Sequence, residues 1–409
     1  MSALLLTGAI VVRPDAPARA PLHIVGDVIA GEAAAGAKQI DLAGHLVFPG
    51  LVNAHDHLAV NAITPLRART PFPNSYLWAE AFAAHFRDPE VEKALAVPAA
   101  IRCWQGGLKN LLAGATTVAH HDPWDPILDD PHFPVRLLRR FGWCHSLGQA
   151  PRDGLLGTLR DRLGRLVGRA SPFGPPLVKS FAETPPGAPW ILHLGEGTDQ
   201  VARGELAALE TVGCLAANTV LVHGVGLGPA DMARVVERGA AVVWCPSSNL
   251  ALLGATIAPR RLFDARRLAL GTDSRLSGGR DLLDELRVAA AHGDLTPAEL
   301  VQLATVDGAR ILAMPGVGAL VPGCRADALI VRDDGSAPAS RLLACRRADL
   351  CAVVRDGRPA IADPDFAPWF AATGVEAAAV TLDGRPKLLA RAFARPEAAA
   401  LEPGLLLGG

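Results

Sequence analysis

The stretch LVNAHDHLAV, residues 51–60, places His55 and His57 one residue apart at the end of an apolar run. Alternate side chains of a β-strand point to the same side, so a strand here would project both imidazoles together. Two neighbouring imidazoles can begin a metal site, although an H-x-H pattern alone is weak support for one. Whether they bind an ion depends on the other side chains that the fold brings to them.

The chain around this stretch has the pattern of an α/β protein. Between residues 49 and 314, strand-like runs alternate with helical stretches such as the amphipathic segment 100–115. This alternation is typical of βαβ units and a parallel sheet. The length of the region is close to the roughly 250 residues of a (β/α)₈ TIM barrel. We therefore predict a catalytic barrel over 49–314.

The two ends of the chain have a different sequence pattern. Short strands punctuated by Gly and Asp occupy residues 1–48, and similar strands return over 315–395. Such runs with turn residues between them predict β-hairpins. We expect the two segments to form one discontinuous β-sandwich that flanks the barrel, with residues 396–409 as a tail.

Composition excludes several classes of protein. The net charge is −1 and the pI about 6.9, so nothing marks a nucleic-acid or acidic-membrane partner. Seven scattered cysteines without a C-x-x-C motif favour reduced thiols in the cytoplasm. The chain has no apolar run long enough for a membrane helix. The expected partner is a small-molecule substrate, and a homodimer is left open.

Further histidines and carboxylates stand where other apolar runs end. WILHLGEGTD contains His193 and Glu196, VLVHGVGL contains His223, and LALGTDSRLSG contains Asp273. In a TIM barrel the carboxyl ends of the strands converge on one mouth, so these residues are predicted neighbours. Neutral imidazoles and a carboxylate suit Zn²⁺ or Fe²⁺. His55, His57, His193 and Asp273 can therefore hold one divalent ion and leave a position for water.

The same residues suggest a hydrolytic reaction. A divalent ion lowers the pKa of bound water from about 15.7 to roughly 7, and the resulting hydroxide would attack an sp² carbon that bears nitrogen. Asp273 or Glu196 would accept the proton of the water, and Glu196 would donate one to the departing nitrogen. His223 could orient the hydroxide or polarise the electrophile.

The order H-x-H, H-x-x-E, a lone strand-end histidine and TD resembles the amidohydrolase superfamily. It looks most like the mononuclear-metal branch that contains cytosine, guanine and S-adenosylhomocysteine deaminases and triazine hydrolases. VFPGLVNAHDHL is similar to the first barrel strand of that family, and VHG, CPSSN and GTDS to the ends of its sixth, seventh and eighth strands.

The resemblance implies a set of roles and a reaction. It implies that His55, His57, His193 and Asp273 bind the metal, with Zn²⁺ expected ahead of Fe²⁺. It also implies that Glu196 and His223 assist catalysis. The implied reaction is hydrolytic deamination of a small heterocycle of the purine, pyrimidine, pterin or triazine kind. A cleavage of cyclic or linear amides and a non-catalytic barrel scaffold are the alternatives.

Two positions depart from the family pattern. Asp56, between the two histidines, replaces a small residue, and we expect it to point away from the metal into a structural role. A dinuclear site would need a bridging lysine, and Lys179 in PPLVKSFAE is the lysine in the required interval. That stretch fits a helix start at least as well as a strand, which favours one metal over two.

Substrate contacts are less marked in the sequence. His120 and His121 end one strand, and the loop 61–82, which contains Arg67 and Trp78, follows the first metal ligands directly. Loops over a barrel mouth often contact substrate. Asn249 of CPSSN is a further candidate contact. For each of these residues a packing or turn-forming role is the alternative.

Overall fold

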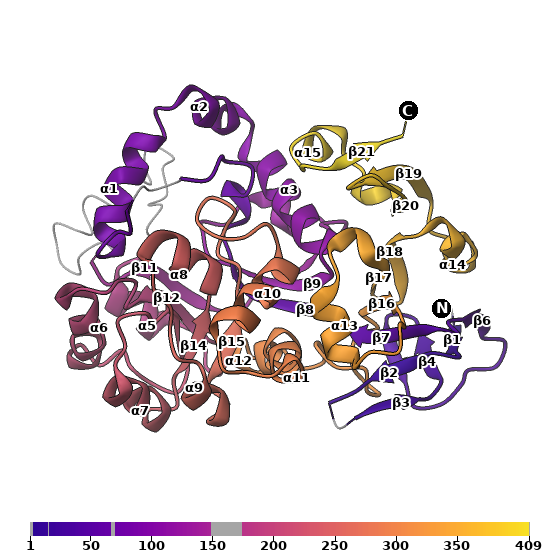
Figure 1. The fold of residues 1–409 in the computed structure, drawn as a ribbon, viewed down its shortest axis with the longest axis horizontal. Coiled ribbons are helices and arrows are strands. Elements are labelled where there is room, and N and C mark those ends of the chain that lie inside the picture. The colour runs from indigo at the N-terminus through magenta and orange to yellow at the C-terminus, as the bar shows by residue number, and fades with distance from the viewer. Residues whose placement is uncertain (1–2, 15, 67–69, 149–173, 409) are drawn as a thin grey trace.

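In the computed structural model, residues 3–14, 16–66, 70–148 and 174–408 are described. An α/β region formed by the middle of the chain lies beside a β-region built from its two ends (Figure 1). The helices of the α/β region lie around its strands. The first and last segments of the chain meet in the β-region, on the other side of the molecule from these helices (Figure 1).

Parallel strands form the centre of the α/β region. In the described part of the chain they make two sheets, ordered β10-β9-β8 and β11-β12-β13-β14-β15. Backbone N–H groups of Thr272 and Asp273 donate to the His55 carbonyl at 3.0 and 3.1 Å, which joins the chain after β15 to β8. The strands are β8 (Leu51–Asp56), β9 (Ala115–His120), β10 (Arg136–Leu137), β11 (Gly142–Ser146), β12 (Trp190–Leu194), β13 (Thr219–His223), β14 (Ala241–Trp244) and β15 (Leu268–Leu270).

The burial of these strands explains their composition. Every residue of β8, β9, β12, β13, β14 and β15 is buried. A parallel strand covered on both faces is nearly continuously apolar, as the runs before His193 and His223 are. The polar residue that ends each run therefore stands at the carboxyl edge of the sheet.

Helices cover the strands and begin at recognisable caps. The side chains of Asp199, Asp281 and Thr296 accept hydrogen bonds from backbone N–H groups of the first turns of α6, α10 and α11. The helices of this region are α1 (Ser75–His85), α2 (Pro89–Ala96), α3 (Ala99–Leu112), α5 (Leu177–Glu183), α6 (Gln200–Thr211), α7 (Pro229–Glu237), α8 (Pro246–Leu253), α9 (Arg260–Asp264), α10 (Leu282–His292), α11 (Pro297–Gln302) and α12 (Gly308–Ile311).

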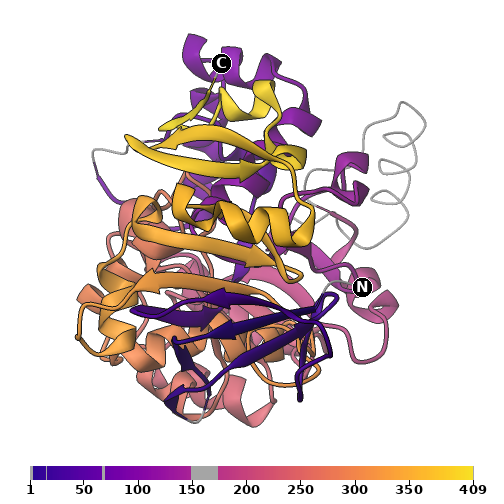
Figure 2. The ribbon, with the colours of Figure 1, turned by 90° about the vertical axis from the view of Figure 1, so that its right-hand side faces the viewer.

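The β-region contains a nine-stranded sheet, ordered β21-β19-β20-β18-β17-β16-β7-β2-β3, and a four-stranded sheet, ordered β5-β4-β1-β6. Figure 2 shows the N-terminal strands lying next to the C-terminal ones. The strands are β1 (Ala3–Thr7), β2 (Ile10–Val12), β3 (Pro17–Arg19), β4 (Leu22–Val25), β5 (Val28–Ala30), β6 (Lys38–Asp41), β7 (His45–Pro49), β16 (Ala328–Arg332), β17 (Leu350–Arg355), β18 (Arg358–Ala362), β19 (Ala377–Leu382), β20 (Arg385–Ala390) and β21 (Leu405–Leu407).

The two ends of the chain meet at one strand pair. Strand β7 pairs antiparallel with β16, so the segment just before β8 is held by strands from the far end of the sequence. Helices α13 (Pro338–Ala344), α14 (Ala367–Thr373) and α15 (Pro396–Ala399) accompany these strands. The segment 396–409, expected as a tail, contributes α15 and β21, and β21 pairs with β19. Among the described residues, none of the helices is long and apolar enough to span a membrane.

Candidate active site

A cavity of about 330 Å³ lies where the parallel strands end, and several of the predicted site residues line it. They reach it from different strands: His57 follows β8, His193 belongs to β12, and His223 ends β13. The lining also contains Glu196 and Asp273. The structure thus brings together side chains that lie more than 200 residues apart in the sequence.

Three imidazoles converge on one point of this cavity. The Nε2 atom of His193 lies 3.2 Å from Nε2 of His55 and 3.3 Å from Nε2 of His57. Two nitrogen ligands of a tetrahedral ion at the usual Zn–N distance are about 3.3 Å apart. The observed spacing is therefore that of three ligands around one divalent ion.

Hydrogen bonds fix which nitrogen of His193 and of His57 faces this point. The Nδ1 atom of His193 lies 2.8 Å from the carbonyl oxygen of His145, which can only accept, so Nδ1 carries the proton. The Nδ1 atom of His57 lies 3.0 Å from Oδ1 of Asp122. Metal-binding histidines commonly donate their second nitrogen to a carbonyl or carboxylate in this way. The lone pairs of both Nε2 atoms are left for an ion.

Asp273 places a carboxylate oxygen beside the three imidazoles. Its Oδ2 accepts hydrogen bonds from Oγ of Ser248 at 2.7 Å and of Ser277 at 2.6 Å. Its Oδ1 lies 3.5 Å from Nε2 of His57 and 3.9 Å from Nε2 of His55. One carboxylate oxygen is thus occupied by hydroxyl groups, and the other faces the imidazoles.

Two of the site residues have a strained backbone. His223 and Asp273 have φ angles of 77° and 54°, in the left-handed region that costs a residue other than glycine about 1–3 kcal/mol. Such strain concentrates at functional sites, where it aims a side chain that regular strand geometry would turn elsewhere.

Burial controls the charges in the cluster. Burial and the neighbouring imidazoles lower the pKa values of His55 and His193 well below the usual range, so both rings are neutral donors. Burial also disfavours a charged His57, but Asp122 and then Asp273 outweigh it and raise the pKa of His57 to about 9. The field at this position therefore favours a positive charge. A divalent ion bound here would satisfy that preference in place of the proton.

Glu196 and His223 face each other beside the cluster. Oε1 of Glu196 lies 3.7 Å from Nε2 of His223, and burial raises the pKa of Glu196 to about 7 although His223 opposes the shift. Nδ1 of His223 lies 2.8 Å from Oδ1 of Asn249, an amide oxygen that can only accept. Nδ1 is therefore the donor, and Nε2 is the nitrogen presented to the cavity. A carboxyl group with a pKa near neutrality can both accept and release a proton.

His121 is a further donor next to the three imidazoles. One ring nitrogen from each of His55, His57, His121 and His193 lies within 4.8 Å of the others. Nε2 of His121 lies 3.0 Å from the carbonyl oxygen of Cys144, and its buried Nδ1 has no hydrogen-bond partner among the described residues. His121, considered above as a substrate contact, is absent from the residues that line the cavity in the described chain.

The other candidate contacts are placed in different ways. Nδ1 of His120 accepts a hydrogen bond from the backbone N–H of Leu58. His120 is not among the described residues that line the cavity. Trp78 lines the cavity, whereas Asn249 holds His223. Arg67 lies outside the described residues. Lys179 sits on helix α5 with its side chain half exposed, 3.8 Å from Glu183.

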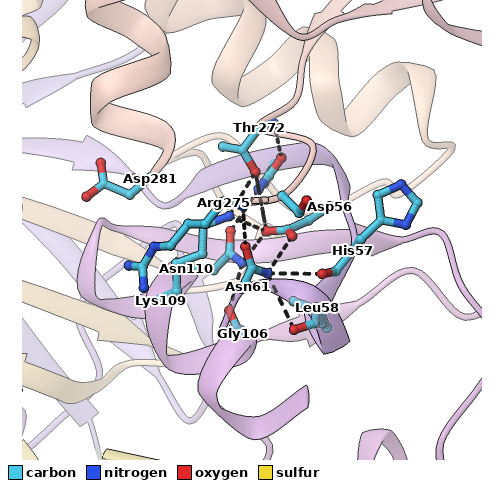
Figure 3. Close-up of polar contacts among 12 residues, drawn as sticks. Asp56, His57, Leu58, Asn61, Gly106, Lys109, Asn110, Thr272, Arg275 and Asp281 are labelled. Carbon is cyan, nitrogen blue, oxygen red and sulfur yellow. Dashed lines mark hydrogen bonds and ion pairs between the residues drawn. The ribbon is translucent and has the colours of Figure 1, made fainter. Parts of the chain in front are cut away.

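Asp56, the last residue of β8, lies in a buried polar network (Figure 3). Its carboxylate accepts from Nζ of Lys109 at 2.9 Å and from the amides of Asn61 and Asn110 at 2.8 and 2.7 Å. The ring of His57 points away from this carboxylate (Figure 3). Asn61 also accepts at Oδ1 from the backbone N–H of Arg275, so the network connects the end of β8 to the segment after Asp273.

Two residues of the site were not anticipated from the sequence. Asp122 holds His57, and His145 lines the cavity and receives the hydrogen bond of His193 through its carbonyl group. The adjacency of Asp122 to the HH pair was a usable signal, because ligand histidines need a carboxylate or carbonyl partner. His145, in the short strand β11, had no comparable signal.

Comparison with known proteins agrees with this geometry. Residues 187–361 match the amidohydrolase family. The 5-methylthioadenosine/S-adenosylhomocysteine deaminases of Haloarcula marismortui and Natronomonas pharaonis are 26% and 27% identical to the chain, each over 81% of it and 84% of the relative.

Solved structures share the fold. An adenosine deaminase from Xanthomonas campestris with bound zinc superposes with a TM-score of 0.66 at 21% identity, covering 91% of this chain and 97% of that one. Atrazine chlorohydrolase from Arthrobacter aurescens, complexed with zinc, gives 0.66 at 21% identity over 87% and 95%. The predicted class, a hydrolase of carbon–nitrogen bonds, is confirmed by these matches. Residues 187–361 thus match the amidohydrolase family, and over most of its length the chain is similar to deaminases of the kind that its motifs predicted.

Proposed function

We propose that the protein catalyses hydrolytic deamination of a heteroaromatic amine with the help of one zinc ion. The observation that carries the proposal is Glu196, a buried carboxyl group with a pKa of about 7, which faces His223 in a cavity beside the converged imidazoles. The names of the deaminase relatives support this choice of reaction.

His55, His57, His193 and Asp273 would hold the ion. The spacing of the three Nε2 atoms and the neutral rings of His55 and His193 fit it. When bound, a divalent ion acts as a Lewis acid and brings the pKa of a water ligand from about 15.7 to roughly 7. The zinc in two of the similar structures supports zinc over iron. His121 lies beside these ligands, and its Nδ1 has no hydrogen-bond partner among the described residues.

Glu196 carries the proton through the reaction. It takes a proton from water as the oxygen bonds to the ring carbon, and it gives that proton to the amino nitrogen as the carbon–nitrogen bond breaks. Ammonia leaves, and the second hydrogen of the water passes to the adjacent ring nitrogen as the ring carbon becomes a carbonyl. Since its pKa is about 7, Glu196 is suited to both transfers at neutral pH.

His223 assists from the other side of the carboxyl group. Asn249 holds the proton of the ring on Nδ1 and thereby fixes the orientation of Nε2 toward the cavity. A fixed ring next to the carbon under attack stabilises developing charge without reorganisation during the reaction. We propose this as the role of His223, with Asn249 as its positioning residue.

The proposal extends to the architecture and location of the protein. We propose that the two parallel sheets form one (β/α)₈ barrel, supported by the hydrogen bonds from Thr272 and Asp273 to His55. All seven cysteines are free thiols, which supports a reducing compartment such as the cytoplasm.

Metal analysis followed by a screen for ammonia release tests the proposal. The panel contains aminopurines, aminopyrimidines, aminotriazines, aminopterins and cyclic amides. We expect about one zinc per chain and ammonia from at least one aminoheterocycle. Opening of a cyclic amide without ammonia from any aminoheterocycle would favour the amide-cleaving alternative. Inactivity of the metal-loaded protein toward the whole panel would contradict the proposal.

A further inference from the structure

The cavity has two chemically different halves. Its polar half surrounds Glu196 and the imidazoles, where the reaction is proposed to occur. The opposite wall comes mainly from helix α1 and is apolar. Among the described residues this wall is made by Val60, Trp78, Ala79, Phe82, Ala83, Phe86 and Leu276.

The spacing of these residues shows that one face of α1 is turned toward the cavity. Trp78, Phe82 and Phe86 are four residues apart, and side chains at that spacing lie on the same face of a helix. The rings of Trp78 and Phe82 stack at 4.9 Å between centroids, and those of Phe82 and Phe86 lie 4.1 Å apart. They form a continuous aromatic surface.

Hydrogen bonds fix this surface relative to the catalytic carboxyl group. The backbone N–H of Ser75 donates to the carbonyl of Glu196 at 2.8 Å, and that of Thr198 donates to Pro73 at 2.8 Å. Asn74, the N-cap of α1, donates from Nδ2 to Oδ2 of Asp199 at 2.6 Å. The beginning of α1 is therefore attached to the loop that carries Glu196, so the apolar wall stands at a set distance from the reacting group.

The charged residues of the cavity lie in its polar half and not on the apolar wall. The described residues that line it include carboxylates and imidazoles near Glu196 but neither lysine nor arginine. A phosphate or carboxylate placed against these described residues would lose water without gaining a cation from them, which is costly. An alkyl or aryl group there would bury apolar area, at about 25 cal/mol per Å². A cavity of about 330 Å³ is large enough for a small ring and such a group.

We propose that the substrate is an uncharged heteroaromatic amine with an alkyl or aryl substituent, which packs on the aromatic face of α1 while the amino group meets Glu196. This inference rests on the proposed deaminase function. It ranks hydroxylated substituents below apolar ones.

Matched pairs of compounds test the proposal. On aminopurine, aminopyrimidine and aminotriazine rings, a butyl group is compared with a trihydroxybutyl group on the same atom, and kcat/KM is measured from ammonia release by the zinc-loaded enzyme. On each ring that reacts, we expect the butyl compound to be favoured at least about tenfold, since small apolar groups are worth that much in an apolar pocket. Equal values, or a preference for the hydroxylated compound, would overturn the inference and leave the deaminase function in place. Absence of ammonia from every pair would overturn the inference, and absence of ammonia from the whole panel of aminoheterocycles would overturn the deaminase function as well.

Variants of the wall provide a second readout. Phe82→Ser should lower kcat/KM about tenfold for the butyl compound and less than about twofold for its hydroxylated partner. Ala83 is an exposed position that also lines the cavity, so Ala83→Asp adds a charge there without removing a buried side chain. It should also lower kcat/KM more for the butyl compound than for its hydroxylated partner. Leu406→Ser, on a remote residue with 66% of its surface exposed, is the control and should change neither value. Equal losses for both compounds in the wall variants would contradict the proposed contact.

Discussion

Lys109 and Asp56 form an ion pair 2.9 Å long in which both side chains are fully buried, next to the two histidines at the end of β8. Removal of one partner from a buried pair leaves an uncompensated charge and typically costs about 3–5 kcal/mol. We therefore expect Asp56→Asn to lower the free energy of unfolding by about that amount, measured by urea denaturation. The exposed pair of Arg139 and Asp129 is the matched control, and Asp129→Asn should cost less than about 1 kcal/mol. Equal effects of the two substitutions would contradict a structural role for the buried pair.

Asp122 should control metal affinity through His57. Its carboxylate lies 3.0 Å from Nδ1 of His57, and loss of such a partner commonly weakens metal binding by about 10–100-fold. We expect Asp122→Asn to show that loss in zinc competition with a chelator. Asp88→Asn is the control, because Asp88 makes a similar 2.8 Å contact with His85, which is not among the candidate ligands. An unchanged zinc affinity in Asp122→Asn would contradict the assignment of His57 as a ligand.

Lys179 should have no part in metal binding. Its side chain is 52% exposed on α5 and faces Glu183 rather than the imidazoles. We expect Lys179→Ala to retain the zinc content of the unmodified protein, whereas His193→Ala should lose most of it. Elemental analysis of the purified proteins measures both. Loss of a second ion from Lys179→Ala would instead indicate a dinuclear site.

Glu285 should make stability fall as the pH rises. Burial raises its pKa to about 8, although the N–H of Ser247 donates to Oε1 at 2.8 Å. In the unfolded chain this group ionises near pH 4.5, while in the folded protein it keeps its proton until about pH 8. The unfolded state thus binds fewer protons over that interval, and folding stability declines across it.

The substitution Glu285→Gln removes this titration. We therefore compare the melting temperatures of the variant and of the unmodified protein at each pH. The difference, variant minus unmodified, should increase between about pH 4.5 and 8 and stay constant above that. Glu237→Gln, whose side chain is 67% exposed, should show no such trend. A difference for Glu285→Gln that stays constant with pH would contradict the shifted titration.

The positions of the main site residues were predictable because they follow a simple physical pattern. A buried parallel strand is apolar throughout, so a polar residue that ends the run marks its carboxyl edge. His193, His223 and Asp273 all stand at or just after such an end. The same logic gave an α/β fold with a flanking β-region, which the structure and its similar folds support.

Other features depend on contacts that no local pattern encodes. Lys109 lies in a helix whose residues are buried all round from Cys103 to Leu112, so an amphipathic pattern did not reveal it as an interior cation. His145 reaches the site only because Ser146 pairs with His193 across a register shift between β11 and β12. The sheet position of the segment after Pro396 likewise follows from pairing between β21 and β19.

Ammonia release by Glu196→Gln, measured together with zinc content, tests the central claim most directly. The glutamine keeps the shape of the side chain but can no longer accept and return a proton, and general acid–base groups contribute about 10²–10⁴-fold to rate. We predict about one zinc per chain, as in the unmodified protein, and a fall in kcat of at least about 100-fold. Turnover equal to that of the unmodified protein in the zinc-loaded variant would contradict the account.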